Sequence, residues 1–106
     1  MTNQEFMLTV DECVVSCKKI LNSKRKEYSF EDDRFSNFNS AAGLQSCSPE
    51  QALYGMLAKH LVAINDLIDE DAQGEEISKK EWEAKIFDAI NYLWLLQGML
   101  KEKGAM

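Results

Sequence analysis

The sequence predicts an all-α fold, a compact antiparallel bundle of three long helices and one short helix. Three observations predict it. Apolar residues recur at three-and-four spacing along three long segments, and two Ser-x-x-Gln or Ser-x-x-Glu sequences have the form of helix-starting capping boxes. In addition, no alternating β-branched run bounded by turn residues indicates a strand. The 106 residues are enough for a single domain, residues 1–106, with one hydrophobic core.

The first long helix is expected at about residues 3–26. A basic cluster at Lys24, Arg25 and Lys26 suits the partial negative charge at its C-terminal end. The apolar stripe of this helix consists of Phe6, Met7, Val10, Cys13, Val14, Cys17, Ile20 and Leu21.

The short helix is expected at about residues 32–42. Asp32 or Asp33 is the predicted N-cap, and Gly43 is the predicted stop. The core-facing side is expected to carry Phe35, Phe38 and Ala42, with Asp33, Arg34 and Asn37 on the opposite side.

The other two long helices begin with clear signals. Ser48-Pro49-Glu50-Gln51 combines an N-cap, a first-turn proline and a capping-box glutamine, which predicts a helix over 49–71. Ser78-Lys79-Lys80-Glu81 predicts a second capping box and a helix over 79–102. The acidic segment between these helices is expected to be a solvated turn.

Composition narrows the function classes. The net charge of −6 argues against binding to bulk nucleic acid, which depends on clustered Lys and Arg side chains. The N-terminal residues lack the pattern of a secretory signal, and the apolar run from Ala89 to Leu100 is too short to span a membrane. A cytoplasmic protein is therefore expected. In a reducing compartment the three cysteines, Cys13, Cys17 and Cys47, would remain thiols.

The last helix carries more apolar residues than one stripe needs. Between Phe87 and Met99 they surround nearly its whole circumference, which predicts either a central helix or a second face that meets another copy of the chain. A homo-oligomer formed through the last helix is the favoured interpretation, because large apolar patches are seldom left in water. Asp88 and Asn91 are expected on this second face, near Leu95 and Met99.

Asp88 needs a partner, because a carboxylate beside apolar neighbours is costly when it is unpaired. An antiparallel arrangement places it at the level of Val62, within about one turn of Lys59. One interpretation is a structural Asp88–Lys59 ion pair, and the other is that both side chains face a pocket and bind a ligand.

His60 falls inside an apolar stripe with Leu57 and Ile64. It is either a hydrogen-bonded core histidine or a general base that acts at a cavity. Zinc would need Cys47 and His60 to complete a site with Cys13 and Cys17, which lie in the core stripe of the first helix, so a zinc site is not favoured.

Three segments carry a resemblance to a known group of proteins. The blocks YSFEDDRFSNF, GMLAKH and KIFDAINYLWLL, within residues 26–100, resemble the signature blocks of a small phage and prophage family associated with nucleotide modification. That family is distantly similar to the MazG-like all-α nucleoside triphosphate pyrophosphohydrolases. The resemblance implies that these positions converge on a nucleotide-binding site, namely Asp33, Arg34, Asn37, Lys59, His60, Asp88 and Asn91.

MazG-like enzymes hold Mg²⁺ with Glu-Glu-x-x-Glu on one helix and Glu-x-x-Asp on the next. The nearest equivalents here begin at Asn65-Asp66-x-x-Asp69 and at Lys85-x-x-Asp88, so Asn65 and Lys85 replace two of the five carboxylates. The resemblance implies Asp88 as a catalytic residue and a Mg²⁺ ligand. His60, in the general-base role described above, is the second candidate catalytic residue.

Two functions follow as hypotheses. The first is a phage-type protein that binds a nucleotide or is a diverged nucleotide pyrophosphohydrolase. The second is a non-enzymatic homo-oligomeric interaction module, whose last helix forms the contact and whose polar cluster fixes the packing.

Overall fold

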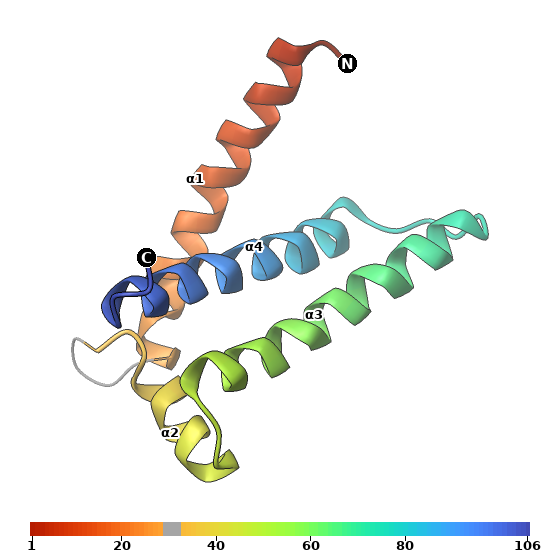
Figure 1. Ribbon diagram of the computed structural model, residues 1–106. Helices are drawn as coiled ribbons and strands as arrows, with labels where there is room; N and C mark the ends of the chain where they lie inside the picture. Colours follow the sequence, from red (N-terminus) through yellow and green to blue (C-terminus); the bar gives the residue numbers. More distant parts are fainter. Residues whose placement is uncertain (29–32) are drawn as a thin grey trace.

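The described part of the chain folds into four helices. The computed structural model describes residues 1–28 and 33–106, with side chains for all of these except 24–28. The helices are α1 (Asn3–Tyr28), α2 (Ser36–Gln45), α3 (Pro49–Ala72) and α4 (Lys79–Glu102). No strand occurs within the described ranges, which confirms the predicted all-α bundle. Figure 1 shows α3 and α4 as an antiparallel hairpin, with α2 beside the start of α3 and α1 crossing α4.

The caps explain why α3 and α4 start where the sequence predicts. The Ser48 side chain accepts a hydrogen bond from the Gln51 backbone N–H at 3.1 Å, and the Gln51 side chain accepts one from the Ser48 N–H at 2.9 Å. The Ser78 side chain likewise accepts from the Glu81 N–H at 3.1 Å. These bonds satisfy N–H groups that have no partner inside the helix. At the other end of the hairpin, Lys103 lies 3.4 Å from Glu50 and ties the end of α4 to the start of α3.

The short helix is displaced from its predicted position of 32–42. Its start at residue 32 lies outside the described residues, and α2 begins at Ser36 because Asp33 accepts a hydrogen bond from the Phe35 N–H and forms a turn instead of an N-cap. Gly43 is not the stop. The helix continues to Gln45, and its C-cap residue Ser46 takes a left-handed conformation (φ 55°, ψ 46°) and donates its N–H to Gly43 O, while Cys47 N–H donates to Ala42 O.

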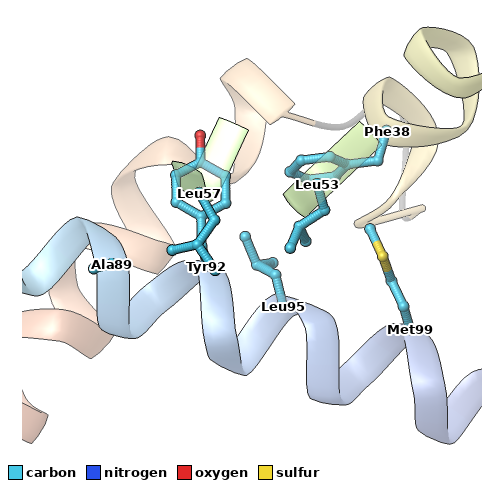
Figure 2. Close-up of a cluster of buried hydrophobic side chains, with 7 residues drawn as sticks. All are labelled: Phe38, Leu53, Leu57, Ala89, Tyr92, Leu95 and Met99. Carbon is cyan, nitrogen blue, oxygen red and sulfur yellow. The ribbon is translucent and has the colours of Figure 1, made fainter. Parts of the chain in front are cut away.

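The core lies between α3, α4 and α2. Figure 2 shows its side chains gathered along one side of α4, and Leu21 of α1 packs against the same cluster. Full burial of a leucine such as Leu53 stabilises the fold by about 1.5–3 kcal/mol. The cluster consists of Phe38, Leu53, Leu57, Ala89, Tyr92, Leu95 and Met99.

The face of α4 that carries Asp88, Asn91, Leu95 and Met99 is the core side, not a second outer face as predicted. Asn91, Leu95 and Met99 are all buried. The outward side carries Leu93, which is half exposed, and Trp94, which is about one third exposed (36%). In the part of the chain that the structure describes, no helix is both long and apolar enough to cross a membrane.

The N-terminal half of α1 extends away from the rest of the bundle (Figure 1). The radius of gyration of 15.8 Å reflects this, since a compact chain of this length has a value of about 13 Å. Consequently the apolar stripe of α1 is covered progressively along the helix: Phe6 and Met7 are exposed, Val10 and Val14 are partly buried, and Cys17 is fully buried.

Candidate functional site

His60 and Asp88 form the polar centre of the hairpin. The Nδ1 atom of His60 lies 3.9 Å from Oδ2 of Asp88, and both side chains are about one quarter exposed. His60 is held by its place in the apolar stripe of α3, and Asp88 lies on the core side of α4. The structure therefore pairs Asp88 with His60, and the Asp88–Lys59 ion pair considered from the sequence is not formed. Lys59 is exposed, about 100° around α3 from His60.

An aromatic chain connects this pair to α2. The rings of His60 and Tyr92 lie 4.9 Å apart at an angle of 34°, and the ring of Phe38 meets Tyr92 edge-on at 6.3 Å. Such contacts fix ring orientation and add about 0.5–1.5 kcal/mol per aromatic pair. The histidine is therefore positioned by packing on one side and by a carboxylate on the other. Tyr92 was not predicted as part of the site, although its spacing of four residues from Asp88 places both on one face of α4.

Cys17 borders the same cluster from α1. Its Sγ lies 3.8 Å from Sγ of Cys13, and its side chain is fully buried. Burial raises the pKa of the Cys17 thiol to about 12, with smaller contributions from Cys13 and from the negative charge of Asp88. A thiol that stays protonated at neutral pH is not a nucleophile.

Asn91 is the most unusual polar group of the site. It is only 5% exposed, and among the described residues neither its side-chain oxygen nor its side-chain nitrogen has a hydrogen-bond partner. An unsatisfied buried group costs about 1–3 kcal/mol. Asn91 follows Asp88 by three residues, so both lie on neighbouring positions of one helical face.

Two of the predicted ligand-binding residues near the start of α2, Arg34 and Asp33, form hydrogen bonds within the fold. Arg34 donates from Nη1 to the backbone oxygen of Leu21 at 3.0 Å, which ties the turn before α2 to α1. Asp33 accepts the Phe35 N–H, and Asn37 is half-buried. Lys59, the predicted ligand-binding residue on α3, is exposed.

The described side chains that could bind a metal ion come together at most in pairs. Among the described side chains, no group of three or more His, Cys, Asp or Glu residues lies close enough to hold a metal ion. Asp88 is paired with an imidazole, while Asp66 and Asp69 are exposed on α3. A zinc site from Cys13, Cys17, Cys47 and His60 is not formed either.

Comparison with known proteins adds no relative. No protein-family model matches the chain, and no curated protein or solved structure matches it either.

Proposed function

We propose that the protein is a non-enzymatic interaction module that self-associates through the outer face of the α3–α4 hairpin. The observation that carries this proposal is a set of half-exposed apolar side chains, seven residues apart on each helix. Residues at this spacing are displaced by only about 20° per repeat, so each set forms a continuous row. This surface is called the hairpin face and consists of Tyr54, Leu61 and Ile68 of α3 with Ile86 and Leu93 of α4.

The two rows lie on the same side of the hairpin. Leu61 is about 80° around α3 from the buried Leu53, and Leu93 is about 160° around α4 from the buried Leu95. His60 and Asp88 lie on the opposite side of the hairpin, which faces the core. Phe38 of α2 and Leu21 of α1 pack on that side. The hairpin face is therefore directed away from both α1 and α2. Leu61 is 48% exposed and Leu93 is 52% exposed, so about half of each apolar side chain is open to a partner.

The area of the hairpin face suits a second copy of the chain. A 24-residue helix is about 36 Å long and about 10 Å wide, so two side by side present about 700 Å². Stable interfaces of standard size bury about 800 Å² on each partner. A symmetric contact between two such hairpins gives a four-helix arrangement, in which each apolar row packs against its equivalent.

Charge also favours a second copy. Five acidic and no basic residues lie between Asp69 and Glu76, at the turn end of the hairpin. Lys101 lies in the last turn of α4, at the opposite end. That end also carries Glu50, Glu102 and Lys103, so it is close to neutral. A two-fold axis perpendicular to the hairpin brings the acidic end of one copy to this neutral end of the other and keeps the two acidic ends apart, which favours this antiparallel orientation.

The test is the mass in solution of three variants. Leu61→Glu and Leu93→Glu place a charge in the hairpin face, and each is expected to shift the light-scattering mass from two chains toward one. Val62→Glu is the matched control, because Val62 is exposed and adjacent to Leu61 but lies about 100° away around α3. Circular dichroism verifies that each variant remains helical. Equal effects of Leu61→Glu and Val62→Glu would contradict the proposal.

A nucleotide-binding role is a second candidate, and Asn91 is the observation that favours it. Its orphaned amide offers a donor and an acceptor side by side, the pair that the edge of a nucleobase would complement. Asp88 and His60 lie nearby on the core side. The resemblance to the phage family and to MazG-like hydrolases implies a nucleotide-binding site at these same positions. At such a site, Asp88 would be the ligand of Mg²⁺.

Thermal unfolding with a panel of nucleotides, with and without Mg²⁺, tests this second candidate. A bound nucleotide is expected to raise the Tm of the wild type and to leave the Tm of Asn91→Leu unchanged. Asn91→Leu also tests the purely structural role, because an apolar side chain of similar size removes the unsatisfied groups and is expected to raise the basal Tm. An unchanged wild-type Tm across the panel would exclude the nucleotide.

A further inference from the structure

Cys13 and Cys17 form a pair of thiols on α1, outside the hairpin face. Their Sγ atoms lie 3.8 Å apart, because residues four positions apart lie on one face of a helix. The two thiols differ in their access to solvent. Cys13 is half-buried, whereas Cys17 is fully buried. A small solute can therefore reach the first thiol but not the second.

A hollow leads to Cys13 from solvent. It has a volume of about 330 Å³ and lies between α1 and the start of α4, with Cys13 and Phe87 among the residues that border it. Figure 1 shows the two helices crossing in this region. A water molecule occupies about 30 Å³ in the liquid, so a molecule as small as hydrogen peroxide fits beside the Cys13 sulfur.

The geometry of this helical turn permits a covalent bridge between the two sulfurs. The Cα atoms of residues four apart in an α-helix are about 6 Å apart, within the range of about 4.4–6.8 Å found in disulfides. The Cβ atoms are about 5–6 Å apart in a regular helix and must approach to about 3.8 Å in a disulfide. The turn from Cys13 to Cys17 must therefore tighten when the bridge forms.

We propose that Cys13 and Cys17 are a reversible redox site, at which hydrogen peroxide converts the two thiols into a disulfide. Cys13 reacts first, because it borders the hollow. Its thiolate attacks one oxygen of the peroxide, an S–O bond forms and the O–O bond breaks. The products are a sulfenic acid on Cys13 and hydroxide, which combines with the proton released by Cys13 to give water.

Cys17 completes the bridge. Burial raises the pKa of its thiol to about 12, with smaller contributions from Cys13 and Asp88, so this thiol stays protonated and does not begin the reaction. The Cys17 sulfur already contacts that of Cys13 and attacks it in the sulfenic acid, so that an S–S bond forms and the S–O bond breaks. The leaving hydroxyl takes up the Cys17 proton and departs as water. In sum, two thiols and one hydrogen peroxide give one disulfide and two molecules of water.

The bridge is expected to loosen α1 from the bundle. Cys17 is the fully buried residue of the α1 stripe, and Leu21, one turn further along, packs against the core cluster. Tightening the turn before them shifts both side chains relative to α4. A disulfide with distorted geometry is also more easily reduced, which suits a redox-sensing site better than a permanent structural bridge.

Mass spectrometry of the peroxide-treated wild type tests the bridge directly. With an equimolar amount of hydrogen peroxide, the folded chain is expected to lose two hydrogen atoms, and dithiothreitol is expected to restore them. Tryptic digestion should place the bridge within a single peptide, because no Lys or Arg lies between Cys13 and Cys17. Cys47 should still react with iodoacetamide and is the internal reference. Oxidation of Cys13 to a sulfinic acid while Cys17 stays free, or two chains linked by a disulfide on a non-reducing gel, would overturn the proposal.

Thermal unfolding tests the effect of the bridge on the fold. Peroxide is expected to lower the Tm of the wild type by several degrees, and dithiothreitol to reverse the change. The Tm of Cys13→Ser should not respond to peroxide, whereas the matched control Cys47→Ser should respond as the wild type does. In Cys17→Ala the sulfenic acid on Cys13 has no thiol to react with, so dimedone should label it. A bridged wild type whose Tm is unchanged or higher would overturn the loosening of α1.

Discussion

Nδ1 of His60 lies 3.9 Å from Oδ2 of Asp88 and joins the middle of α3 to the middle of α4. The ring of Tyr92 packs against the imidazole from one turn further along α4. A polar pair with an aromatic neighbour, placed at the centre of an otherwise apolar helix contact, fixes the register of the two helices. This role is structural, and it makes the pair the natural point at which to measure hairpin stability.

The His60–Asp88 pair is expected to show direct energetic coupling. Urea denaturation of Asp88→Asn, His60→Gln and the double variant should give a coupling free energy of about 0.5–1.5 kcal/mol, as for residues in contact.

Lys59→Met is the control for this cycle. Because Lys59 is exposed and does not pair with Asp88, its removal should change the free energy of unfolding by less than about 0.5 kcal/mol. If Lys59→Met lowers the free energy of unfolding more than His60→Gln does, the stabilising partner of Asp88 is Lys59 and not His60.

Cys17 is expected to make the fold sensitive to alkaline pH. Its pKa is raised from 9.0 to about 12 by burial, so above pH 9 the unfolded chain loses this proton while the folded chain keeps it. The contribution is therefore complete below pH 9 and is lost as the pH rises toward 12, at up to about 1.4 kcal/mol per pH unit.

The measurement is the free energy of unfolding at a series of pH values for Cys17→Ala and the wild type. Below pH 9 the free energy of unfolding of Cys17→Ala should be lower than that of the wild type, because the variant loses packing. This difference in free energy should shrink as the pH rises above 9. Cys47→Ala, which leaves Cys17 in place, should track the wild type. Parallel curves for Cys17→Ala and the wild type would show that the Cys17 thiol does not carry this dependence.

Two helical glycines are expected to respond differently to alanine. A Cβ at Gly55 would meet nothing within 4 Å, so Gly55→Ala should raise the free energy of unfolding by about 0.5–1 kcal/mol. A Cβ at Gly98 would lie 2.9 Å from Cζ of Phe35, so the ring must move. Gly98→Ala should therefore be less stable than Gly55→Ala by about 1–3 kcal/mol, the usual cost of overpacking. Similar stability of the two variants in urea denaturation would mean that the Phe35 ring moves without cost.

The long helices were predictable because their ends are encoded locally. The Ser48 and Ser78 caps fix the starts of α3 and α4 through hydrogen bonds to residues three positions away, and both helices begin at the predicted residue. The C-terminal end of the short helix was not predictable in this way. The sequence signal for its end was Gly43, but the residue that takes the left-handed conformation and caps the helix is Ser46.

The candidate site was predictable in part. The sequence predicted the height of Asp88 along α3 to within about one turn. Which α3 side chain it contacts depends on how α3 is rotated about its own axis. His60 already lay in the apolar stripe with Leu57 and Ile64, a signal that it faces α4 while Lys59 does not. The orphaned state of Asn91 had no signal in the sequence, because it depends on which side chains of other helices surround it.

The mass of the wild-type chain in solution is the most direct test of the central claim, that the hairpin face joins two copies. Sedimentation equilibrium over a hundredfold range of concentration should give at least two chains across most of that range, with dissociation only at the dilute end. A mass of one chain at every concentration would contradict the claim, because it would mean that Leu61 and Leu93 stay in contact with water.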